Sequence, residues 1–188
     1  TSVKELVTED TIVIKKAPYI EPMAPNPMKM YAAEFFKNGK LQRNKIKAHP
    51  KYPYGILRED MQEMILDKMQ LLINQKMIKG IGENGMEYTV IAQILNLPKD
   101  IVRLIQKFDL TRKNPKMIYI NTSETVISLE DSILTAFLHL IGFEISSATS
   151  APNVTIVSRL LISIVLTIRS TSSELTSSEF IFSLSATI

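Results

Sequence analysis

The chain has 188 residues, of which 45% are apolar and 22% charged, and its net charge is +3. This composition is ordinary for a globular protein, and so small a net charge gives no strong argument for a nucleic-acid or acidic-membrane partner. The absence of cysteine excludes disulfides, thiolate catalysis and zinc–thiolate sites, and the first ten residues do not resemble a signal peptide.

The first part of the chain predicts a strand, an extended arm and a basic connection. Thr11–Ile14 is a β-branched run that favours a strand, and prolines interrupt residues 17–28, which argues against a helix there. Six basic residues and no acid lie between residues 37 and 51: Lys37, Lys40, Arg43, Lys45, Lys47 and Lys51. Two interpretations stay open, a loop that contacts phosphate or nucleic acid and a solvated connection balanced by the acids that follow.

The longest predicted helix covers residues 56–79, where apolar side chains recur at helical spacing. Acids lie near its start and lysines near its end, as the helix dipole favours. Gly80 would end the helix. The GIGENG segment that follows predicts a turn rather than a phosphate-binding loop, because it lacks the glycine spacing of those motifs.

Residues 88–108 predict two shorter helices joined at Asn96-Leu97-Pro98. Ala92 occupies the small-residue position of a helix-turn-helix, and the second helix would present cations to DNA phosphates or base edges. These cations are Lys99, Arg103 and Lys107. The alternative is an ordinary helical hairpin, which needs the same small and apolar positions.

Residues 117–145 predict a strand, a polar loop, a helix and the start of a second strand. Met117–Ile120 is a short apolar run that suits a buried strand. Ser128 would cap the helix, Asp131 would suit its dipole, and Gly142 would end it. The pattern is a βαβ unit in outline, and in open α/β sheets ligands bind at the carboxyl ends of the strands.

The polar loop after this strand is the predicted ligand site. Its residues are Asn121, Thr122, Ser123 and Glu124. The alternative is a loop that only caps the strand and the helix. We interpret Ser132, Thr135 and His139, which share one side of the predicted helix, as its solvent face.

No catalytic residue, cofactor or metal site follows from the spacing of the side chains. His49 and His139 are 90 residues apart and have no accompanying ligand spacing, so no metal site is expected. No serine has the elbow signature of a hydrolase, and no nucleophile–base pair is apparent.

The composition changes sharply near Glu144. Residues 145–188 hold twelve Ser and six Thr but no Lys, Asp or Gly. We therefore expect residues 1–144 to be a fragment of a larger α/β domain and residues 145–188 to be a poorly ordered tail, with out-of-frame sequence as the hypothesis for its origin. The apolar stretch at 154–168 has only fifteen residues and contains Arg159, so no membrane span is expected.

Two long segments resemble the YceG-like proteins of bacterial tellurite-resistance (Ter-type) stress operons. They are HPKYPYGILREDMQEMILDKMQLLINQKMIKG (49–80) and NPKMIYINTSETVISLEDSILTAFLHLIGFE (114–144). The resemblance covers roughly residues 10–144. It implies a cytoplasmic component of a biosynthetic module encoded beside TerD-like and TelA-like proteins, which would be its partners. Members of this family are longer, and no catalytic position is carried over from them.

Together these features predict an α/β, Rossmann-like fragment with a helical, helix-turn-helix-like insertion at residues 56–108. The expected function is that of a stress-response component that binds a nucleotide-like or sugar-like ligand at residues 121–124. The alternative is a DNA-binding module that uses residues 88–108.

Overall fold

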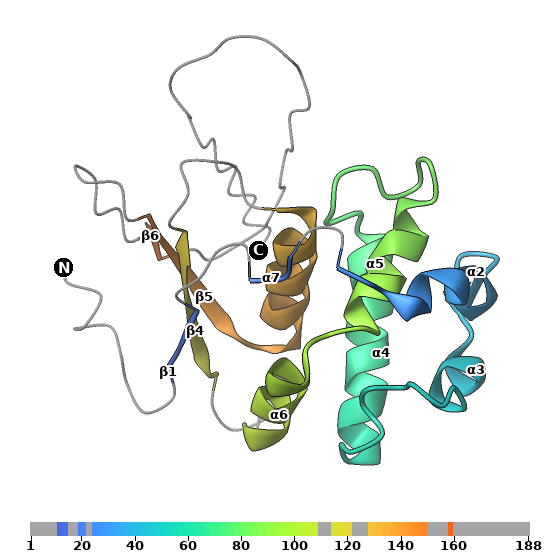
Figure 1. Cartoon of the computed structure of the whole chain (residues 1–188), viewed down its shortest axis with the longest axis horizontal. Helices are drawn as coiled ribbons and strands as arrows, with labels where there is room; N and C mark the ends of the chain where they lie inside the picture. Colours follow the sequence, from blue (N-terminus) through green and yellow to red (C-terminus); the bar gives the residue numbers. More distant parts are fainter. Residues whose placement is uncertain are drawn as a thin grey trace, which may run out of the picture.

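The computed structural model describes residues 11–14, 19–21, 24–108, 114–121, 128–149 and 158–159. In these ranges the chain forms a small sheet and a larger set of helices, so the α/β class is confirmed at this level. Figure 1 shows the sheet, then α7 (Leu129–Ile141), then α4 (Glu59–Asn74) with α5 (Met86–Ile94). Two short helices, α2 (Ala32–Phe35) and α3 (Arg43–Lys47), lie on the side away from the sheet.

The sheet has four strands in the order β1-β4-β5-β6. β1 (Thr11–Ile14), β4 (Lys116–Asn121) and β5 (Glu144–Thr149) run parallel, and β6 (Ser158–Arg159) pairs antiparallel with β5. The predicted strands at 11–14 and 117–120 are confirmed, and β4 is one residue longer at each end. The predicted return strand is also present as β5, and it continues through Thr149, beyond the predicted end of the domain.

A helical region separates β1 from β4, and it begins well before the predicted residue 56. It opens with the short 3₁₀ helix η1 (Pro27–Met30), where proline is tolerated because the first turn has no helical partner for its missing N–H. After α2 come the hairpin strands β2 (Phe36–Lys37) and β3 (Lys40–Leu41). Their Asn38-Gly39 turn has positive φ angles of 52° and 74°, the conformation that an Asn-Gly hairpin favours. The region closes with α6 (Lys99–Lys107).

The long helix α4 lies inside its predicted bounds but is shorter than predicted. Gly80 does not end it, because the helix already stops at Asn74 and Lys76 adopts a left-handed φ of 51°. The reversal returns Ile78 to the core, where it is 1% exposed. The apolar surface that Ile78 buries favours this early turn over a continuation of the helix.

The helix α7 begins and ends as predicted, since Ser128 caps it and Gly142 follows it with a φ of 117°. The predicted solvent face is wrong for Ser132 and Thr135, while His139 is partly exposed. Ser132 and Thr135 are 0% and 6% exposed, because α7 packs on β5 on one side and on α4 and α5 on the other. Their hydroxyls instead donate to carbonyls of their own helix, which satisfies them inside the core.

The segment predicted to be a tail is described only in part. Within residues 145–188 the structure describes β5 through Thr149 and β6, so the remaining residues of the predicted tail lie outside the described ones. In the described part of the chain, no helix has the length and apolar character needed to cross a membrane.

Candidate functional site

The three parallel strands end at the same edge of the sheet, where Ile14, Asn121 and Thr149 are their last residues. Ligands of open α/β sheets bind at this carboxyl edge. The predicted ligand loop starts there, because Asn121 is the last residue of β4. Thr122, Ser123 and Glu124 lie outside the described residues, so the ligand loop itself stays a prediction.

The first turn of α7 returns from this edge and is held by a buried carboxylate. Ser128 Oγ accepts a hydrogen bond from the backbone N–H of Asp131 at 3.1 Å, which confirms the predicted cap. Asp131 itself is 0% exposed. Its two oxygens accept hydrogen bonds from the backbone N–H groups of Tyr19 at 2.7 Å and Ile20 at 2.8 Å. A buried carboxylate that accepts two N–H bonds is a strong, directional anchor, here for the segment that follows β1.

Sequence reasoning missed this role of Asp131. The local pattern assigns the residue to the helix dipole, an assignment that needs only its neighbours. Its partners lie 112 and 111 residues earlier in the chain. The signal available in the sequence is a pair of acids, Glu130 and Asp131, in the first turn of a largely apolar helix, and that signal identifies no partner.

The side chain of Tyr19 extends from the same segment to the start of α6. Its hydroxyl lies 3.2 Å from Asp100 Oδ2 and donates to it. Burial, together with the neighbouring Asp100 carboxylate, raises the pKa of Tyr19 to about 12. The hydroxyl therefore keeps its proton, and remains a donor, at neutral pH.

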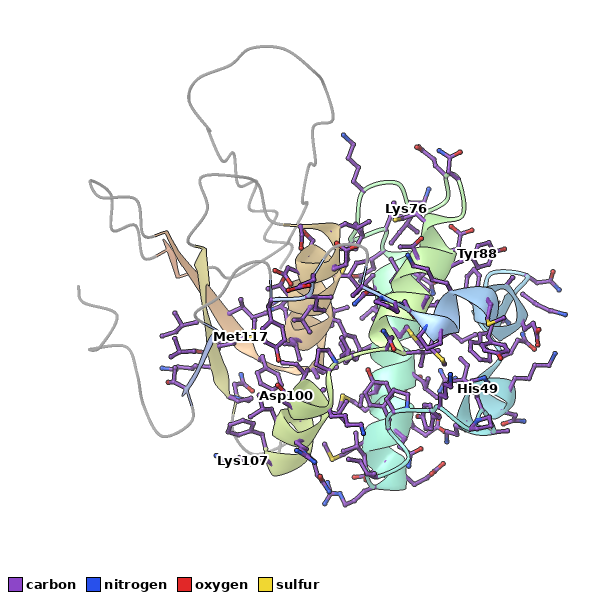
Figure 2. The ribbon with its side chains drawn as sticks, viewed as in Figure 1. His49, Lys76, Tyr88, Asp100, Lys107 and Met117 are labelled. Carbon is purple, nitrogen blue, oxygen red and sulfur yellow. The ribbon has the colours of Figure 1, made fainter. Side chains whose placement is uncertain are left out.

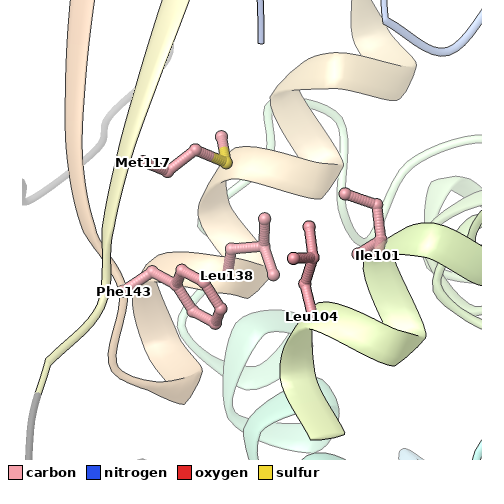
Figure 3. Close-up of a pocket in the computed structure, with 5 residues that line it drawn as sticks. All are labelled: Ile101, Leu104, Met117, Leu138 and Phe143. Atoms are coloured by element: carbon pink, nitrogen blue, oxygen red, sulfur yellow. The ribbon is translucent and has the colours of Figure 1, made fainter. Parts of the chain in front are cut away.

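Below this edge α6 packs on the sheet and α7 through an apolar seam. Figure 3 shows Ile101 and Leu104 of α6 directed toward Leu138 of α7, Met117 of β4 and Phe143. The hollow between them leaves no room for a water molecule. It therefore offers no polar group and no space to a ligand, and we assign it to packing.

The predicted pair of helices over residues 88–108 is present as α5 and α6, and Ala92 of α5 is fully buried. The three predicted DNA-contacting residues, Lys99, Arg103 and Lys107, are all exposed. Figure 2 labels Asp100 at the start and Lys107 at the end of α6. Asp100 is also exposed, so the outer side of this helix carries one acid beside its cations.

The basic segment of residues 37–51 is partly neutralised by α4. Arg43 pairs with Glu63 at 2.7 Å and with Asp67, and Lys47 pairs with Glu59 and Glu63. The hydrogen bond from Lys47, followed by that from Arg43, lowers the pKa of Glu63. The interpretation as a connection balanced by the following acids is therefore confirmed for Arg43 and Lys47.

The two histidines lie in unrelated surroundings. The ring of His49 stacks beside Tyr31 and Phe35, with ring centroids 4.5 Å and 5.6 Å away. His139 lies in the last turn of α7, and its buried Nδ1 has no hydrogen-bond partner among the described residues. In the ranges that the structure describes, no group of three or more His, Asp or Glu side chains could hold a metal ion.

Comparison with known proteins gives a family. The YceG domain family model matches residues 1–175. A curated relative, the uncharacterized protein YceG of Bacillus subtilis (strain 168), is 22% identical over 141 residues, which are 73% of this chain and 26% of the relative. The chain thus spans about a quarter of the length of this relative. No solved structure matches the chain. The match over most of its length shows that the chain belongs to the YceG domain family.

Proposed function

We propose that this chain contributes a binding site for a nucleotide-like or sugar-like ligand at the carboxyl edge of its sheet. One observation supports the proposal: β1, β4 and β5 are parallel and end at the same edge of the sheet, and the β4–α7 loop begins at that edge with Asn121. Asn121, Thr122, Ser123 and Glu124 would supply amide, hydroxyl and carboxylate groups, which suit the hydroxyls of a sugar or a ribose.

The biological setting belongs to the same proposal. The resemblance to YceG-like proteins of Ter-type operons supports a cytoplasmic role in a tellurite-resistance or stress-response biosynthetic module. TerD-like and TelA-like proteins would be its partners. Because the chain covers about a quarter of its curated relative, we propose a ligand-binding role for it and assign it no reaction.

Ligand binding is tested by thermal shift of the purified chain against nucleotides and nucleotide sugars. A compound that binds only the folded state raises the melting temperature, and at 100 times its dissociation constant it adds about 2.7 kcal/mol of stability. The variant Thr122→Ala/Ser123→Ala should lose the shift. The control Asn44→Ala, at an exposed position on α3, should keep it. No shift with any compound, or equal shifts in both variants, would contradict the proposal.

A second candidate function is DNA binding through α6. The observation that favours it is the division of this helix into two sides. Its apolar residues Ile101, Val102 and Ile105 are at most 3% exposed. Lys99, Arg103 and Lys107 are exposed on the other side, at the four-residue spacing that aligns side chains along a helix.

DNA binding is tested by fluorescence anisotropy of a labelled duplex over a salt series. The variant Lys99→Gln/Arg103→Gln/Lys107→Gln should weaken binding and reduce the slope of log affinity against log salt by about three, one for each phosphate that the variant no longer neutralises. The matched control Lys37→Gln/Lys40→Gln/Lys45→Gln removes the same charge from the hairpin and α3. Equal weakening in both variants would show that only net charge matters and would overturn this candidate.

A further inference from the structure

The segment Tyr19–Ile20 contacts two helices that come from distant parts of the chain. Its backbone N–H groups donate to Asp131 in the first turn of α7. The hydroxyl of Tyr19 donates to Asp100 in the first turn of α6. The segment also follows β1, so it leaves the sheet at the edge where α7 begins.

The attachment at Asp131 is the rigid end of this connection. Both carboxylate oxygens lie at full burial, and each accepts a backbone N–H at 2.8 Å or less. Loss of these bonds would remove the acceptor from two backbone N–H groups, at least one of them buried, which is costly in an apolar interior. Tyr19 and the first turn of α7 must therefore move together.

Among the residues that the structure describes, Asp100 provides the one polar side-chain contact between α6 and the rest of the chain. The first turn of α6 has no side-chain cap. Its remaining contacts with the sheet and α7 are apolar, through Ile101 and Leu104 (Figure 3), and apolar contacts have no preferred direction. The hydrogen bond from Tyr19 is therefore the directional side-chain contact at the start of α6.

We infer that Tyr19 is a positioning residue that links the carboxyl edge of the sheet to α6, so that a displacement of the first turn of α7 displaces the exposed cationic side of α6. The link does not depend on the proposed ligand or on DNA binding, because it uses only contacts within the chain. It provides a route by which occupancy of the edge would alter the surface that Lys99, Arg103 and Lys107 form.

Hydrogen–deuterium exchange of the full chain tests the link. Tyr19→Phe removes the hydroxyl and keeps the ring and both backbone bonds to Asp131. The amides of α6 should then exchange about two- to tenfold faster, while those of α7 stay at the wild-type rate. The matched control Tyr88→Phe, at an exposed position on α5, should leave α6 unchanged. Wild-type exchange of α6 in Tyr19→Phe would overturn the inference.

A second pair of variants tests whether Tyr19 transmits displacement from Asp131 to Asp100 or whether the two contacts act independently. Asp131→Ala removes both acceptors, and Asp131→Asn keeps one acceptor oxygen in a side chain of the same shape. Neither substitution touches α6 directly. If Tyr19 transmits displacement, both variants should speed the exchange of α6, Asp131→Asn by less than Asp131→Ala. Faster exchange confined to Tyr19, Ile20 and the start of α7 would overturn the link, and Asp131→Asn keeps the test valid if Asp131→Ala fails to fold.

Discussion

At the scale of single residues, Tyr54 shows how one polar group can be placed in the core without penalty. The side chain is 0% exposed, and its hydroxyl donates to the carbonyl of Ile94 at 2.7 Å. Ile94 is the last residue of α5, where a carbonyl has no partner within its own helix. Tyr54, which lies 40 residues earlier in the chain, thus supplies the hydrogen-bond donor that the last carbonyl of α5 lacks.

We expect Tyr54→Phe to lower the free energy of unfolding by about 1–3 kcal/mol, because it leaves a buried carbonyl without a donor. Urea unfolding measures the loss. Tyr88→Phe is the control, since its side chain is 38% exposed and water can replace the partners of its hydroxyl. Equal stability of the two variants would mean that the hydroxyl of Tyr54 contributes nothing.

The same residue predicts a loss of stability at alkaline pH. Complete burial raises the pKa of Tyr54 well above 10.0. Above that pH the unfolded chain releases a proton that folded Tyr54 keeps, so the folded state binds more protons and stability falls as the pH rises. Urea unfolding at several alkaline pH values should show this fall, and a smaller fall in Tyr54→Phe. An identical pH dependence in both proteins would assign the effect to other tyrosines.

At the scale of elements, the ends of the helices are decided by a few backbone angles. Gly142 follows α7 with a φ of 117°, a conformation that a residue with a Cβ rarely adopts. A Cβ at this position would meet no atom within 4 Å, so any effect of a substitution there is backbone strain and not a clash. Gly55 offers the opposite case, because its φ lies outside that region and its nearest contact would be 3.9 Å away.

Gly142→Ala should therefore destabilise the protein by about 1–2 kcal/mol through strain alone. Gly55→Ala should stabilise it by about 0.4–1 kcal/mol, because alanine restricts the unfolded chain. Thermal or urea unfolding of the two variants compares them directly. The idea fails if both substitutions change stability in the same direction.

The ion pairs between α3 and α4 are a second feature of this scale. Hydrogen bonds from Lys47 and then Arg43 lower the pKa of Glu63 from 4.5. Below pH 4.5 Glu63 becomes protonated in the unfolded chain while it stays ionised in the folded protein. Its contribution to stability is therefore lost as the pH falls through the pKa of folded Glu63. The pairs are largely exposed, with 41% of the Glu63 side chain accessible, so their contribution is small.

We expect Glu63→Gln to lower the free energy of unfolding by about 0.2–1 kcal/mol at neutral pH and low salt. The difference from the wild type should shrink in high salt and at acid pH, where screening or protonation removes the pairing in both proteins. Urea unfolding over a salt and pH series measures it. A salt-independent difference would indicate that the substitution acts through packing rather than through charge.

At the scale of the whole molecule, Asp131 ties the sheet to the helical layers. The segment that it holds leaves β1 and leads into η1, where Asn26 donates to the carbonyl of Ala92 on α5 at 3.1 Å. The chain between β1 and α2 is thus fastened to α7 and then to α5. The first contact joins the segment after β1 to α7, and the second joins the start of η1 to α5, so the connection from the sheet is held at both ends.

Asp131→Ala should lower the free energy of unfolding by about 2–4 kcal/mol, since it strips the acceptors from two N–H groups of which at least one is buried. The control Asp60→Ala removes an acid from the first turn of α4, where the side chain is 67% exposed and pairs with the neighbouring Arg58. That variant should change stability by less than about 1 kcal/mol, the value of a surface pair. Similar losses in both variants would mean that Asp131 stabilises the protein only through the dipole of α7 and not through its bonds to Tyr19 and Ile20.

The sequence by itself determined the local parts of this fold. The strand at Met117–Ile120, the cap at Ser128 and the stop at Gly142 all follow from neighbours within four residues, and such patterns can be read along a chain. The same holds for the exposure of Lys99, Arg103 and Lys107, because helical spacing places them opposite the apolar residues of α6. Of the loop predicted to bind a ligand, the structure describes only the first residue, Asn121, at the edge where β4 ends.

Only the tertiary structure decided which polar residues are buried and what they bind. Ser132 and Thr135 are core residues because α7 is covered on two sides, and a helical pattern gives no account of a second covering layer. The chain turns at Lys76, just after α4, because this turn lets Ile78 bury its side chain in the core. Asp131 finds its partners more than 100 residues away, and contacts of that range arise from the packing of whole elements rather than from any local pattern.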